Sequence, residues 1–69
     1  MNLKQAQFLS EAYLPREDLH DAVLAVLIEG MSVYEAERTH KLPACSLGRA
    51  VKKIQRIYDH AEQVMRLEN

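Results

Sequence analysis

The sequence has very little of the residues that usually cross-link or interrupt a small fold. It contains one cysteine, two glycines, two prolines and no tryptophan in 69 residues. Because Cys45 has no second cysteine to pair with, an intrachain disulfide is excluded. Cysteine and histidine also lack zinc-finger spacing. A core of this size is marginal, so we expect stability to come from close helix packing, from association with a second copy, or from both.

Long apolar runs and catalytic patterns are missing as well. No segment resembles a membrane span or a signal-peptide core, so we expect a cytoplasmic protein, and a lone cysteine agrees with a reducing compartment. We find no Ser/His/Asp set, no phosphate-binding glycine loop and no pair of carboxylates suited to acid–base chemistry. The expectation is a protein that is not an enzyme, with no cofactor, no metal and no small-molecule substrate.

Charge is distributed unevenly along the chain. The net charge is −1, yet residues 1–37 carry seven acids and two bases, whereas residues 38–58 carry bases and no acid. The bases of this second segment are Arg38, Lys41, Arg49, Lys52, Lys53 and Arg56. Acids at i+4, which pair with bases on an ordinary surface helix, are missing here. A purely basic third of a nearly neutral chain favours an anionic partner.

Hydrophobic spacing predicts an all-α fold of four helices in a single domain, residues 1–69. The first helix covers residues 3–13, and Pro15 separates it from a second helix at 16–29 that ends before Gly30. The predicted inward stripe of the first helix is Leu3, Ala6, Leu9 and Tyr13, with Phe8 outside it. The second helix is apolar on nearly all sides, so it is expected to be central. Alternatively, Leu24 and Ile28 face a second subunit.

The two remaining helices are predicted from a cap, a proline and a heptad pattern. The spacing of Ser32 and Glu35 predicts a capping box that opens a third helix, which runs to about His40. Pro43 then stops any continuation, and a long fourth helix follows at 44–67. Its apolar residues have the 4-3-4-3-4 spacing of a heptad a/d stripe: Leu47, Val51, Ile54, Tyr58, Ala61 and Met65. The basic side chains cluster around the opposite face.

A two-turn helix, a short turn and a longer helix with an apolar inner stripe are typical of a helix-turn-helix, which we predict at residues 31–57. Packing between the third and fourth helices is expected to involve Glu37 together with Tyr34 or Ala36. Leu42 is expected to fill the turn between the two helices. The long C-terminal helix would then be the recognition helix. Candidate base contacts lie at its start: Ala44, Cys45, Ser46, Gly48 and Arg49. Candidate phosphate contacts are Arg38, Lys41, Lys52, Lys53 and Arg56.

The tail, residues 58–69, extends beyond what two short helices can cover. Tyr58, Ala61 and Met65 could pack on residues 3–13 of the same chain or on a partner, and the partner is favoured because a small core benefits from doubling. Cys45 has two interpretations. A thiol at a helix N-terminus beside bases has a lowered pKa, which would suit redox control, but a small residue tolerated beside DNA is the simpler explanation.

Several motifs resemble the TrfB/KorA plasmid transcriptional repressors, and similarly the PapB-type regulators of adhesin operons. They are "VLIEG", the later "LPACSLGRAVKKI" with its L-x-x-A-V-x-[KR]-I pattern, and an L-x-x-x-Q-F pattern near the start. The resemblance covers most of residues 3–57. It implies a dimeric, sequence-specific repressor that binds a palindromic operator through this helix. Lys41 stands where the family commonly has glycine, and Pro43 where it commonly has serine or threonine.

The sequence therefore predicts a bacterial, plasmid or phage DNA-binding repressor. Its expected partners are double-stranded DNA and a second copy of the chain, with no membrane involved. The alternative is a small helical adaptor or anti-regulator whose basic face contacts an acidic protein.

Overall fold

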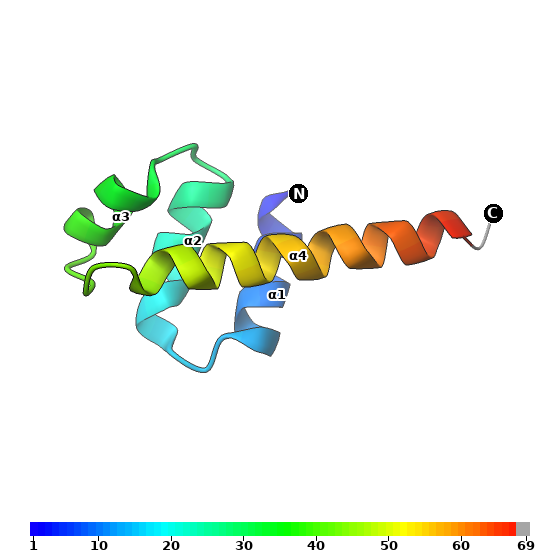
Figure 1. The fold of residues 1–69 in the computed structure, drawn as a ribbon, viewed down its shortest axis with the longest axis horizontal. Helices are drawn as coiled ribbons and strands as arrows, with labels where there is room; N and C mark the ends of the chain where they lie inside the picture. The colour runs from blue at the N-terminus through cyan, green and yellow to red at the C-terminus, as the bar shows by residue number, and fades with distance from the viewer. Residues whose placement is uncertain (68–69) are drawn as a thin grey trace.

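Four α-helices and one short 3-10 helix form the fold in the computed structural model, which describes residues 1–67 (Figure 1). This part of the chain contains no strand, so the prediction of an all-α protein with four helices is confirmed. In chain order the elements are α1 (Leu3–Tyr13), η1 (Glu17–Leu19), α2 (His20–Leu27), α3 (Val33–Thr39) and α4 (Ser46–Leu67).

Helix α4 is the long axis of the molecule, which measures 43 × 23 × 19 Å (Figure 1). Helices α1, α2 and α3 all contact it. α3 lies at its N-terminal end, and α1 and α2 cross behind it (Figure 1). The last turns of α4 extend past the other helices. One helix therefore organises the domain and also projects from it.

The buried core is small and rich in alanine. Leu47 and Ile54 of α4 are fully buried, and so is Val23 of α2. The ten buried apolar residues are Ala6, Leu14, Leu19, Ala22, Val23, Ala25, Ala36, Leu47, Ala50 and Ile54. Alanines let helices approach closely, but each contributes little burial, and a fully buried leucine or isoleucine contributes about 1.5–3 kcal/mol. Leu47 and Ile54 are consequently the main links between α4 and the rest of the domain.

Helix α1 has the predicted bounds but a different inward face. Asn2 and Gln5 form a reciprocal capping box: each side-chain oxygen accepts the backbone N–H of the other residue at 2.9 Å. Leu3 and Tyr13 are about half exposed, although the spacing predicts them to face the core. Ala6, which the spacing also predicts to face inward, is buried, Leu9 packs against the core, and Ser10 is buried in addition. Small side chains one helical turn apart allow α1 to approach the other helices closely.

Helix α2 begins later than predicted. The segment after Pro15 first forms the 3-10 helix η1, a common arrangement at helix starts, and regular α-helix begins at His20. Arg16 donates hydrogen bonds to Asp18 at 2.6 and 3.2 Å, which lower the pKa of that carboxyl. At the other end, α2 stops at Leu27, before the predicted end at residue 29, and Gly30 has a φ of 80° in the turn that follows.

Ser10 provides a test of this packing. Its hydroxyl is buried and has no hydrogen-bond partner, so it carries a desolvation cost without compensation. We expect Ser10→Ala to raise the free energy of unfolding by about 1 kcal/mol in urea denaturation. Ser32→Ala is the matched control, because the Ser32 hydroxyl accepts the Glu35 N–H at 3.1 Å and its loss should cost about 1 kcal/mol. A Ser10→Ala variant with a lower free energy of unfolding would contradict the inference that the buried Ser10 hydroxyl has no hydrogen-bond partner.

Candidate nucleic-acid interface

Six residues, 40–45, connect α3 to α4, and the first half of this connection is a Schellman motif. The Leu42 N–H donates to the Glu37 carbonyl at 2.8 Å, and the Lys41 N–H donates to the Arg38 carbonyl at 3.2 Å. Lys41 has a φ of 55°, in the left-handed region that glycine adopts at least cost. Leu42 packs against the core as predicted. Lys41 thus occupies a position that favours glycine.

The second half of the connection delays the start of α4. Cys45 has a φ of 68°, and the Ser46 N–H and hydroxyl both donate to the Pro43 carbonyl, at 3.3 and 2.7 Å. The chain becomes helical only at Ser46. The predicted helix start at residue 44 is therefore wrong, because a left-handed residue interrupts the helical path. Ala44 and Cys45 lie in the turn before the helix.

Glu37 connects α3 directly to the first turn of α4. Its Oε2 accepts the backbone N–H of Leu47 at 3.1 Å, in a partly buried position. The first N–H groups of a helix have no partner within the helix, and a carboxylate is favourable at this positive end of the helix dipole. The bond therefore fixes the start of α4 relative to α3. The sequence predicts Glu37 to pack across the helix pair, and its hydrogen bond to Leu47 is a further contact that the pattern does not indicate.

A hollow of about 490 Å³ lies between α3 and the start of α4. It brings together four predicted DNA-contacting residues with three from α3. The lining residues are Val33, Tyr34, Glu37, Cys45, Gly48, Arg49 and Lys52. Gly48 is half-buried, and a Cβ at its position would lie 3.9 Å from Val33 Cγ1. Gly48 therefore faces α3 rather than the outward side expected of it.

Tyr34 faces outward, and the residue that packs inward on α3 is Ala36. Tyr34 is 69% exposed and Ala36 is fully buried. The guanidinium carbon of Arg38 lies 5.7 Å from the centre of the Tyr34 ring, within cation–π range. Tyr34 is thus a member of the candidate site that the sequence analysis missed. Its i, i+4 spacing to Arg38 was the available signal.

The four basic side chains in the first half of α4 are all exposed, but they fall into two groups. Arg49, Lys52 and Arg56 are exposed, and within residues 1–67 none of them forms an ion pair. Lys53 instead donates to the carbonyl oxygen of Tyr13 at 3.0 Å, which ties α4 to the end of α1. Lys53 is therefore less available to a phosphate than the other three.

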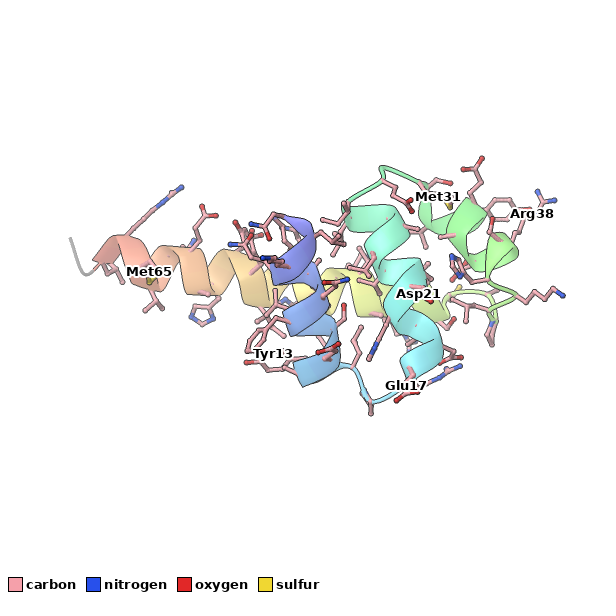
Figure 2. All side chains as sticks on the ribbon, turned by 180° about the vertical axis from the view of Figure 1, so that it is seen from behind. Tyr13, Glu17, Asp21, Met31, Arg38 and Met65 are labelled. Carbon is pink, nitrogen blue, oxygen red and sulfur yellow. The ribbon has the colours of Figure 1, made fainter. Side chains whose placement is uncertain are left out.

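The remaining predicted residues lie on separate parts of the surface. Arg38 and Lys41 are exposed around the end of α3, and Figure 2 shows Arg38 and Met65 at opposite ends of the molecule. Tyr58 is half-buried, whereas Ala61 and Met65 are exposed on α4. The predicted tail includes residues 68–69, which lie outside the described residues. Half-buried Leu24 of α2 and Ile28, the residue that follows this helix, line a different hollow together with Leu3, Asp21, Glu29 and His40.

No protein-family model, curated protein or solved structure matches the chain. Across residues 1–67 there is no group of three or more His, Cys, Asp or Glu side chains that could hold a metal ion. In the same part of the chain, no helix has the length and apolar character needed to cross a membrane. The surface of α3 and α4 is therefore the basis for inferring function.

The left-handed conformation of Lys41 generates a prediction. A side chain in this region costs about 1–2 kcal/mol, which glycine avoids, although glycine also loses more entropy on folding. We expect Lys41→Gly to raise the free energy of unfolding by about 1 kcal/mol. Lys41→Ala removes the same charge but keeps the Cβ, so chemical denaturation should show no comparable gain. Equal stabilities of the two variants would contradict the inference that the left-handed backbone at Lys41 lowers the free energy of unfolding.

Proposed function

We propose that this chain is a transcriptional repressor that binds double-stranded DNA in a sequence-specific manner, as a homodimer on a palindromic operator. One observation carries the proposal: the basic face of α4 is exposed along Arg49, Lys52 and Arg56, while its opposite face is buried in the domain. Three exposed bases along one face of a helix, none of them held in an ion pair within residues 1–67, form the kind of electrostatic surface that nucleic acid requires.

The arrangement of α3 and α4 supports a helix-turn-helix. Helix α3 is short, and α4 is fixed against it by the Glu37–Leu47 hydrogen bond. Their six-residue connection is longer than the usual turn of three or four residues, so the motif is a variant of the common form. Arg49 lies in the first turns of α4, where a recognition helix contacts bases, and its guanidinium is suited to guanine O6 and N7.

Phosphate contacts follow from position along α4. Lys52 and Arg56 are exposed one and two turns beyond Arg49, where side chains of a recognition helix meet the DNA backbone. Arg38 and Lys41 flank the start of the helix. Lys53 contributes mainly by its bond to α1, a change from its predicted role. The turn residues Ala44 and Cys45 would approach the DNA through their backbone.

The resemblance to the TrfB/KorA repressors supports the same function. In the L-x-x-A-V-x-[KR]-I pattern, Leu47, Ala50 and Ile54 are buried and Val51 is half-buried. These are the positions that seat a recognition helix on its domain. A bacterial cytoplasmic repressor of plasmid or phage origin, without enzymatic activity, is the function that we propose.

Two substitutions on α4 test the division between base and phosphate contacts. We expect Arg49→Ala to cost about 1–3 kcal/mol of binding free energy and to relax preference at one base position. Lys52→Ala should weaken binding to all duplexes alike and should reduce the slope of log K against log salt by about 1. Fluorescence anisotropy titrations at several salt concentrations measure both effects.

Arg16→Ala is the matched control, because Arg16 is an exposed base in the connection between α1 and η1, outside α4, and pairs with Asp18. It should leave DNA affinity unchanged. The same loss from Arg49→Ala and Lys52→Ala on every sequence would contradict the assigned roles. Failure of the unaltered protein to bind any duplex would favour the helical adaptor.

A further inference from the structure

A second hollow, of about 360 Å³, lies between α1 and the distal part of α4. It is lined by Lys4, Gln5, Phe8, Leu9, Tyr58 and Ala61, of which only Lys4 is charged. None of these residues belongs to the proposed DNA-contacting surface. The basic face of α4 also points away from the stripe that contains Tyr58 and Ala61, since the two faces are on opposite sides of the helix. This hollow therefore remains accessible when DNA is bound.

The apolar lining of the hollow is only partly used by the domain's own core, because Leu9 packs against that core whereas Phe8 does not. Phe8 is the only phenylalanine of the chain, and it is 69% exposed. Farther along α4 and outside this lining, Val64 is 48% exposed. Aromatic residues usually provide a large share of core stabilisation, but half of this core is alanine. An exposed apolar surface beside so small a core is typical of an association site.

The projecting end of α4, residues 59–67, is named here the arm. All of its residues are exposed, and it extends past α1 (Figure 1). The arm cannot fill the hollow of its own chain, because Tyr58 and Ala61 on the same continuous helix form one wall of it. A second molecule has to supply any occupant.

We propose that the occupant is the arm of a second copy of this chain. Each arm would lie in the hollow of the other copy, a reciprocal contact of the kind found in two-fold dimers. The charges are complementary, because Lys4 stands at the edge of the hollow and Glu62 borders the apolar stripe of the arm. Within the arm, Arg66 already pairs with Glu62 at 2.9 Å, but that pair is exposed and therefore weak.

The proposed dimer therefore forms through α1 and the arm, rather than through Leu24 and Ile28 at the end of α2. The arm contact rests on the proposed function in one respect only, which is that a dimer would bind an operator with two half-sites. Self-association itself requires no DNA.

A charge exchange between two variants tests the contact. Lys4→Glu and Glu62→Lys each place like charges at both junctions of a homodimer, whereas a mixture of the two variants has opposite charges at both junctions. We expect the dissociation constant of each variant alone to rise roughly tenfold, and the mixture to recover the affinity of the unaltered chain. Sedimentation velocity measures all three, and circular dichroism verifies that each variant keeps its helix content.

A second variant tests the apolar part of the surface. Ala61 is exposed, so Ala61→Glu should fold normally and still abolish self-association. Gln63→Glu adds the same charge on the other side of the arm and should leave self-association unchanged. A monomeric unaltered chain at about 100 µM, well above the dissociation constant of a specific dimer, would overturn the proposal. The proposal would also be overturned if Lys4→Glu and Glu62→Lys each associated as strongly alone as when mixed.

DNA-binding measurements distinguish a failure of the arm contact from a failure of the proposed DNA-binding function. If Ala61→Glu still binds a duplex with one half-site but loses its preference for two half-sites, both proposals hold. A chain that dimerises through the arm and binds no duplex would disprove the DNA-binding function alone. A chain that stays monomeric and binds duplex DNA would disprove the arm contact alone.

Discussion

The burial of one face of α4 is the constraint on which the rest of the structure depends. Leu47 and Ile54 are fully buried, and every other α-helix packs against α4. With so few large residues in the core, the position of α4 cannot change without loss of most of the packing. Because the buried side chains occupy one stripe, the opposite face of the helix stays exposed without cost to the fold. The proposed DNA contacts occupy that exposed face.

Local geometry at the start of α4 determines which residues are presented. Two residues other than glycine, Lys41 and Cys45, adopt left-handed conformations between α3 and α4. The hydrogen bonds of the connection and the Glu37–Leu47 bond hold this path in place. Their effect is to place Tyr34, Arg49 and Lys52 around one hollow. A modest local strain is thus retained at the surface where we propose that the protein works, as is often found at functional sites.

The spacing of apolar residues and the positions of proline and glycine were sufficient to predict much of this fold. The bounds of α1, the turn at Gly30 and the burial of Leu47 and Ile54 follow from apolar spacing, proline and glycine. The start of α4 could not be predicted, because Cys45 carries no glycine-like signal for its left-handed backbone. The partner of Lys53 was also beyond reach, since Tyr13 is 40 residues away in sequence and the bond depends on how α1 crosses α4. On α1, periodicity placed Ala6 and Leu9 correctly, but it also predicted Leu3 and Tyr13 to face inward, and these are about half exposed while Ser10 is buried.

Selection of bound duplexes from a random pool, repeated at two salt concentrations, tests the central claim most directly. Base contacts from the start of α4 and phosphate contacts farther along it should together enrich one sequence over the pool. A dimer should make that sequence palindromic, with half-sites about 34 Å apart, one turn of the double helix. Retention of all duplexes should fall as salt rises, while the preferred sequence remains the most strongly retained. Enrichment of no sequence, or no retention even at low salt, would contradict the account.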